Sequence, residues 1–258
     1  MNSSNGNESR YNIVEMVDSN LTFVGSLIKE YKGNIILENS TEPNSLNDDD
    51  NDNVVIKIHG SFMLLAWLLF ASNGIFTARH ARDMFSRWTC TNGNDIWYGV
   101  HLICMIMTWF LSIVSVIVMF IGHGFDCLKK EKISENPHSL IGIITISLLF
   151  FQPFIACFRP PNNSSNRKWF NGIHSLIGVC CISLSLCAMI FATTLAAAKL
   201  DSTSRTAGFV FIGFLFGCDQ IMTITKKNKL IVLGRTIYVA FVVGSLTMTF
   251  LALLFLLL

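Results

Sequence analysis

Six long apolar stretches alternate with short polar connectors along residues 54–258 of the chain. The stretches cover residues 54–77, 96–121, 138–158, 171–197, 206–225 and 236–258. Each holds about twenty residues with few or no charges, which is the length that an α-helix needs to cross about 30 Å of hydrocarbon. The pattern therefore predicts an all-α membrane protein with six transmembrane helices.

Residues 1–53 have the opposite character and are rich in Asn, Ser, Asp and Glu. Such a segment has too few apolar side chains to fold alone, so we expect a disordered extracellular or lumenal tail. Four acceptor sequences for N-glycosylation favour that side of the membrane, and they begin at Asn2, Asn7, Asn20 and Asn39. No secretory signal precedes the tail. Either the first span directs insertion, or the chain lacks an upstream portion.

Basic residues in the connectors predict the orientation of the spans. One set of connectors carries ten of them, which are Arg79, Arg82, Arg87, Arg159, Arg167, Lys168, Lys226, Lys227, Lys229 and Arg235. The alternate set carries five, which are Lys129, Lys130, Lys132, Lys199 and Arg205. Because cytoplasmic connectors hold the excess of Lys and Arg, the first set should be cytoplasmic. Both termini are then extracellular or lumenal, at a plasma membrane or an endomembrane vesicle.

Composition narrows the classes of function. The chain is 52% hydrophobic and 14% charged, and its mean hydropathy of +0.51 is that of a membrane protein. The net charge of +2 is too small to suggest a nucleic-acid partner. Of the eight cysteines, six fall in apolar stretches, while Cys90 and Cys127 lie in connectors on opposite sides of the membrane. We therefore expect no disulfide framework.

Histidines recur near the start of four consecutive apolar stretches. The pentapeptide His-Ser-Leu-Ile-Gly occurs at residues 138–142 and again at 174–178, and each copy opens a span. His59 and His101 open the first two spans in the same way. An imidazole inside a membrane is costly unless something binds it, so all four histidines are functional candidates.

The alternating direction of the spans sorts these histidines into two pairs. His59 and His138 should lie near the outer face, and His101 and His174 near the cytoplasmic face. Two imidazoles on facing helices of a four-helix bundle can hold a haem iron from both sides, with the two irons about 20 Å apart. The glycine that ends each pentapeptide would let a flat ring lie close to the backbone. Plain helix packing is the better explanation for either glycine taken alone, and it is the coincidence with histidine that favours the ring.

Two other classes of protein remain open. The histidines could form metal sites or a proton relay in a metal-ion transporter, although the spans hold few carboxylates to act with them. Asp219 is the main exception, near the cytoplasmic end of the fifth span and within reach of Lys226 or Lys227. The chain could also be a non-catalytic haem-binding subunit that passes electrons to a partner. His80 and His123 lie in or beside connectors, and His123, on the outer side, is a candidate contact for an electron acceptor.

Short motifs surround the four histidines. They are Lys57-Ile58-His59-Gly60, Tyr98-Gly99-Val100-His101, Pro137-His138-Ser139, Gln152-Pro153, Phe158-Arg159-Pro160-Pro161 and Phe170-Asn171-Gly172-Ile173-His174. Together they resemble the cytochrome b561 domain, in particular the branch found in ferric-chelate reductase 1-like and DOMON-linked proteins. The resemblance covers residues 54–229, the expected haem-binding domain, and leaves 230–258 as a C-terminal transmembrane helix. Residues 1–53 do not resemble a DOMON module.

The resemblance implies two haem b groups, one held by His59 and His138 and the other by His101 and His174. It also implies a transmembrane oxidoreductase that passes electrons from a cytosolic donor such as ascorbate to an outer acceptor such as ferric chelate or monodehydroascorbate. Two histidines fill both axial positions of each iron, so oxygen binding is not expected. Membrane lipid surrounds such a domain, and a homodimer is left open.

Positive charge near the cytoplasmic haem would suit both an anionic donor and the haem propionates. The candidate donor-site residues are Arg79, Arg82, Arg159 and Lys168. The alternative for each one is an ordinary basic residue at the cytoplasmic end of a span.

Overall fold

The computed structural model describes residues 46–82, 84, 95–124, 129–161, 163–195 and 202–257. The chain divides into two units, residues 1–50 and 51–258, and the second unit holds all of the apolar spans. Residues 1–45 of the tail that is predicted to be disordered lie outside this description, and so do the two connector cysteines Cys90 and Cys127. The six other cysteines are free thiols, as their places in the apolar stretches predict.

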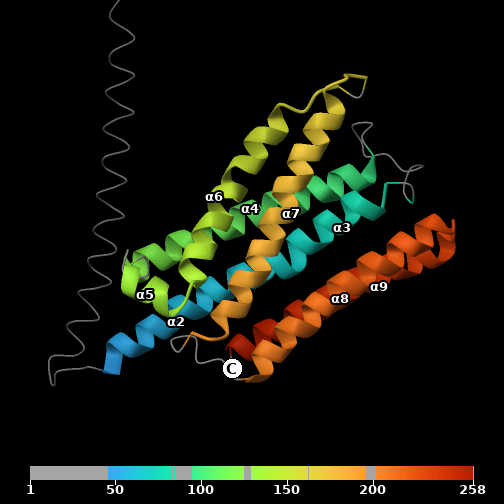
Figure 1. The fold of residues 1–258 in the computed structure, drawn as a ribbon. Coiled ribbons are helices and arrows are strands. Elements are labelled where there is room, and N and C mark those ends of the chain that lie inside the picture. The colour runs from blue at the N-terminus through green and yellow to red at the C-terminus, as the bar shows by residue number, and fades with distance from the viewer. Residues whose placement is uncertain are drawn as a thin grey trace, which may run out of the picture. The chain divides into compact units, whose positions relative to one another are not determined.

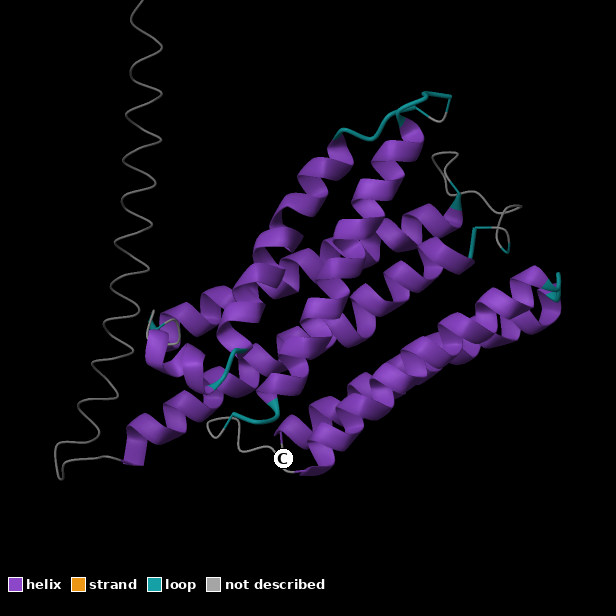
Figure 2. Cartoon of the chain, in the orientation of Figure 1, coloured by secondary structure: helices purple, strands orange, loops and turns teal. Residues whose placement is uncertain are grey.

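The described residues are mainly helical (Figures 1 and 2). The first span is built from α2 (Leu46–Leu64), a π-helical segment η1 (Leu65–Ala71) and α3 (Ser72–His80). The other spans are α4 (Ile96–His123), α6 (His138–Cys157), α7 (Arg167–Ala192), α8 (Ser202–Lys227) and α9 (Ile231–Leu257). A short helix, α5 (Lys130–Glu135), precedes α6. All six spans are long and apolar enough to cross a membrane, which confirms the predicted fold class.

The helices extend beyond several of the predicted ends. The first span continues to His80, α7 begins at Arg167 and α9 begins at Ile231. Basic and polar residues at a helix end can reach the interfacial water while the backbone stays helical, so an apolar run marks only the lipid-facing part. The polar run 47–53, predicted to be unfolded, is the first part of α2.

The first span packs against α4, while α6 and α7 form a hairpin beside them. Small polar residues make the closest approaches: Thr108, Ser112 and Ser115 form a buried stripe along α4, and the Thr108 hydroxyl donates to the Ala66 carbonyl at 3.2 Å. Such residues let membrane helices come close and hydrogen-bond across the contact. The result is a group of four spans whose starting turns carry the four histidines.

The last two spans, α8 and α9, form a second hairpin (orange to red in Figure 1) that packs mainly on the first span. Part of its contact with the first span is aromatic. Phe76 stacks on Phe241 with ring centres 3.8 Å apart, and Phe241 stacks on Phe214 at 5.6 Å. The hairpin thus covers a side of the first span that the four-span group leaves open.

Candidate functional site

The structure brings His59 and His138 together, as the alternating direction of the spans predicts. Their ring centres are 6.3 Å apart and the ring planes are nearly perpendicular, at 84°. The Nδ1–H of His59 donates to the Ser115 carbonyl at 3.1 Å, and the Ser115 hydroxyl lies 2.9 Å from the same nitrogen. The Nδ1–H of His138 donates to the Ala188 carbonyl at 2.8 Å. Each ring is therefore fixed through Nδ1, which leaves Nε2 as the nitrogen available to a ligand.

His101 and His174 form a second pair of almost the same geometry. Their ring centres are 6.4 Å apart, with an angle of 82° between the planes. The Nδ1–H of His101 donates to the Gly74 carbonyl at 3.0 Å. The Nδ1 of His174 is buried and has no hydrogen-bond partner among the described residues. Its ring instead lies parallel to Phe170, with centres 5.8 Å apart.

Both pairs have the separation of two imidazoles that bind one metal from opposite sides. A metal–imidazole bond is about 2 Å long and the ring centre lies about 1 Å beyond the nitrogen, so the two centres should be about 6 Å apart. The hydrogen bond at Nδ1 is the usual support of a metal-binding histidine, because it fixes the tautomer and the ring orientation. Three of the four histidines have this bond.

The two pairs lie at different depths along the bundle. Ser115, which holds His59, is 14 residues after His101 on α4. At about 1.5 Å per residue, the two levels are about 20 Å apart along the helix. This is the separation predicted from the helix starts and the thickness of the bilayer.

The surroundings of the pairs fit haem. Gly142 and Gly178 follow His138 and His174 by one helical turn, and a Cβ built on either glycine meets nothing within 4 Å. Each glycine therefore faces open space where a flat ring can lie against the helix. Within the described part of the chain, no group of three or more His, Cys, Asp or Glu side chains could hold a bare ion. A histidine pair supplies two ligands, and a porphyrin supplies four more to its iron.

A basic cavity of about 580 Å³ lies beside the His101–His174 pair. Its lining consists of Arg82, Asp95, Trp97, Tyr98, Arg159, Pro160, Pro161, Arg167 and Asn171. The Arg82 guanidinium lies 4.5 Å from the centre of the Trp97 ring. The Arg159 guanidinium lies 4.5 Å from the centre of the Tyr98 ring. Aromatic faces hold both cations in place at the cavity wall.

Two lining residues connect this cavity with the histidines. Tyr98 precedes His101 by three residues on α4, and Asn171 precedes His174 by three residues on α7. Residues three apart lie on the same side of a helix, so the cavity is one turn away from the pair. Both residues belong to the motifs around the histidines, but neither was predicted to line a site, although their common spacing to a histidine was a usable signal.

The structure brings only two of the four predicted donor-site cations into this cavity, Arg82 and Arg159. Lys168 lines a separate cavity with Trp169 and Leu176. Arg79 instead donates from Nε to Asp219 at 3.0 Å. His123, the predicted acceptor contact, lies at the end of α4, away from His101 at its start.

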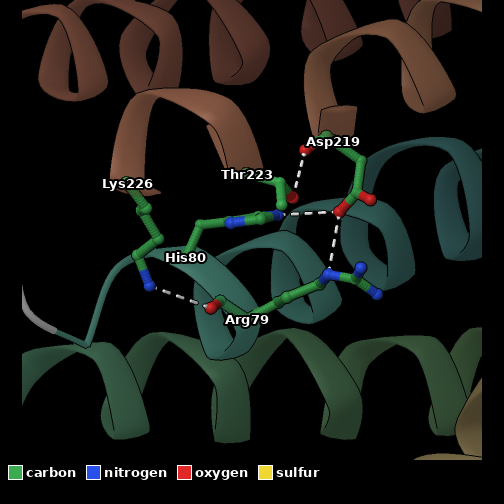
Figure 3. A network of polar contacts seen from close by, with 5 residues as sticks. All are labelled: Arg79, His80, Asp219, Thr223 and Lys226. Atoms are coloured by element: carbon green, nitrogen blue, oxygen red, sulfur yellow. Dashed lines mark hydrogen bonds and ion pairs between the residues drawn. The ribbon is translucent and has the colours of Figure 1, made fainter. Parts of the chain in front are cut away.

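Asp219 is part of a polar network at the ends of the first and fifth spans (Figure 3). The Nε2–H of His80 donates to the Asp219 carboxylate at 2.7 Å, beside the bond from Arg79. Lys226, one of the two residues predicted to reach Asp219, donates to the Arg79 carbonyl at 3.3 Å. His80, placed in or beside a connector from sequence, is 2% exposed, because this network draws the end of α3 under α8.

These features define a helical membrane protein with two stacked pairs of facing histidines. Comparison with known protein families supports this class of protein. The family described as eukaryotic cytochrome b561 matches residues 58–200, which hold all four histidines. The chain belongs to the eukaryotic cytochrome b561 family. Membership implies electron transfer across a membrane, and proteins of this family generally bind haem b.

Known relatives carry the same region in much longer chains. A Drosophila melanogaster protein named "Putative ferric-chelate reductase 1 homolog" is 32% identical over 148 residues, covering 57% of this chain and 22% of the relative. Ferric-chelate reductase 1 of Homo sapiens is 26% identical over 172 residues, covering 66% of this chain and 28% of the relative. The chain thus spans about a quarter of the length of these relatives. No solved structure matches it.

Proposed function

We propose that this chain carries electrons across a membrane through two b-type haems, each held by two histidines. His59 and His138 bind one iron, and His101 and His174 bind the other. The observation that carries the proposal is the geometry of the two pairs, with ring centres 6.3 Å and 6.4 Å apart. The depth difference of about 20 Å between the pairs suits two wide conjugated rings stacked across about 30 Å of hydrocarbon.

The basic cavity marks the side on which electrons enter. Three arginines and one aspartate line it, so it attracts small anions, and its volume suits a compact organic molecule. The connectors on that side also carry the larger share of Lys and Arg, which supports a cytosolic location for them. A cytosolic ascorbate-like anion is therefore the proposed donor. Both termini of the chain then lie on the extracellular or lumenal side.

Each group of residues has a separate task in this proposal. The arginines at the cavity neutralise the donor and hold it one helical turn from His101 and His174. The carbonyls of Gly74, Ser115 and Ala188 keep the histidines in the tautomer whose Nε2 faces a metal. Haem, when bound, supplies reversible one-electron chemistry, and two histidines leave its iron no open position. The site is thus suited to relay electrons and not to activate oxygen.

The proposed acceptor is a ferric chelate on the opposite side, which would make the protein a transmembrane oxidoreductase. The names of the Homo sapiens and Mus musculus relatives, ferric-chelate reductase 1, support this substrate class. Monodehydroascorbate is the other acceptor of suitable chemistry, and His123 remains the candidate contact. If the chain is instead a non-catalytic subunit, it would pass electrons to a protein partner and not to a small-molecule acceptor.

Haem content and spectra of the purified protein test this function. We expect two haems per chain, a reduced-minus-oxidised spectrum of b type, reduction by ascorbate and reoxidation by ferric citrate. A haem-free protein would overturn the proposal and favour the metal-ion transporter. Two haems that ascorbate reduces but ferric citrate and monodehydroascorbate fail to reoxidise would favour the subunit.

A further inference from the structure

The α8–α9 hairpin lies beyond residues 58–200, the part that matches the family, yet polar contacts fasten it to the first span. Three pairs make these contacts: Asn73 with Ser245 at 2.7 Å, Thr77 with Tyr238 at 2.9 Å, and His80 with Asp219 at 2.7 Å. Positions 73, 77 and 80 recur every three to four residues, so they lie on one face of α3. The three pairs form a ladder, which we call the α3 ladder.

The α3 side of the ladder is buried, while the Asp219 side chain at its end is 23% exposed. Thr77 is 1% exposed, His80 2% and Ser245 0%. A buried polar group that has no hydrogen-bond partner costs free energy. Each pair therefore favours one rotation of α3 about its axis and one position of α3 along that axis, relative to the hairpin. The stack of Phe76 on Phe241, at 3.8 Å, adds an apolar contact between the rungs.

A second face of α3 supports a proposed haem ligand. The Gly74 carbonyl accepts the hydrogen bond from Nδ1 of His101. A Cβ at position 74 would lie 2.8 Å from Cβ of Cys104 and 2.5 Å from Cε of Met105. The two backbones can approach this closely only because residue 74 is glycine. Any rotation or slide of α3 therefore changes the hydrogen bond on His101.

The π-helical segment η1 lies between α2 and α3 in the continuous helix of the first span. Its wide turn interrupts the regular α-helical hydrogen bonds between α2 and α3. The Asn73 side chain links α3 to η1 and to the hairpin, since its Nδ2 donates to the Leu69 carbonyl at 2.6 Å and also to the Ser245 hydroxyl at 2.7 Å. The position of α3 thus depends on the hairpin and not only on continuity with α2.

We propose that Asp219 and Tyr238 are positioning residues that set the reduction potential of the haem bound by His101 and His174. They act by holding α3, which holds the Gly74 carbonyl against His101. A strong hydrogen bond at Nδ1 makes the imidazole a better electron donor to the iron and stabilises the ferric state. Loosening α3 should weaken that bond and raise the potential of this haem alone. This inference rests on the proposed function.

Asp219 has the larger predicted influence of the two. Its carboxylate accepts from both Arg79 and His80 (Figure 3). Replacing it by asparagine removes a negative charge as well as a strong hydrogen-bond acceptor, and both changes favour the ferrous haem. Tyr238→Phe removes the hydroxyl that contacts Thr77 and no charge, so its effect reports on this rung of the ladder and not on a lost carboxylate.

A spectroelectrochemical titration that resolves the two haems tests the inference, with electron paramagnetic resonance of the ferric protein as a second readout. Asp219→Asn and Tyr238→Phe should raise the midpoint potential of the His101–His174 haem and shift its resonance signal. The other haem should keep both properties. The matched control is Thr247→Val, because the Thr247 hydroxyl is exposed and, among the described residues, bonds to Val243 of its own helix and to no residue of the first span. This control should change neither haem.

The possible results separate this inference from the proposed function. Unchanged potentials in Tyr238→Phe, or equal shifts of both haems, would overturn the positioning role. If Asp219→Asn fails to fold, Tyr238→Phe and Ser245→Ala still decide the question. His101→Ala serves as the reference: if it keeps two normal haems, the ligand assignment itself fails. If it loses one haem while the hairpin variants shift nothing, only the positioning role fails.

Discussion

The two histidine pairs have the same separation but are held differently. In the His59–His138 pair, both Nδ1 atoms donate to backbone carbonyls, and the Ser115 hydroxyl adds a further contact. In the other pair, only His101 has a hydrogen bond at Nδ1, while His174 lies against an aromatic ring. The basic cavity also lies beside the second pair. One site is thus fixed within the bundle, and the other is adjustable and open to a charged ligand.

Removing one histidine from each pair should have the largest effect and tests whether the sites are independent. His59→Ala and His101→Ala should each lower the haem content from two per chain to one, because a single imidazole holds a b-type haem weakly. The pyridine haemochrome assay measures this loss. The spectrum of the haem that remains identifies it, and the two variants should retain different haems. Loss of both haems in either variant would show that the sites are coupled.

Filling the space beside the glycines should have the next largest effect. Gly142→Leu should reduce haem binding at His138, and Gly178→Leu should do the same at His174, because the side chain would occupy the place of the porphyrin. A change that fills open space leaves the helix contacts intact, so expression and helix content should stay normal. Gly208→Leu is the control, since its Cβ also meets nothing within 4 Å but its helix carries no ligand. Normal haem content in both variants would mean that these glycines face lipid.

The six spans and the pairing of the histidines could be predicted from the sequence. The spans follow from local hydrophobicity, and the pairing follows from the alternating direction of the helices. The partner of Asp219 could not be found in this way. His80 is 139 positions away, and the contact depends on how α8 packs on α3. The positions of Tyr98 and Asn171 beside the second histidine pair could have been predicted from the sequence, because each precedes a histidine by three residues.

Substitution of an arginine that lines the basic cavity should weaken donor binding beside the His101–His174 pair and leave the haem content unchanged. Arg82→Gln and Arg159→Gln should each raise the KM for an anionic donor about tenfold, since a hydrogen bond to a charged group contributes about 1.5 kcal/mol. Both haems should still bind. The effect should shrink at high salt, which screens exposed charges. Steady-state reduction by ascorbate measures it, and Lys168→Gln, outside this cavity, is the matched control.

Ser115→Ala should produce the smallest change, and it tests the His59–His138 site, in which both Nδ1 atoms are hydrogen-bonded. The variant removes the hydroxyl that lies 2.9 Å from Nδ1 of His59 and donates to the His59 carbonyl at 3.0 Å. The Ser115 carbonyl remains and still fixes the tautomer, so haem content should not change. We expect a loss of about 1 kcal/mol in stability, the net value of one buried hydrogen bond, and a small rise in the potential of the His59–His138 haem. Thermal unfolding and redox titration measure these two changes. If Ser115→Ala instead shifts the His101–His174 haem, α4 transmits changes between the two levels and the sites are not held separately.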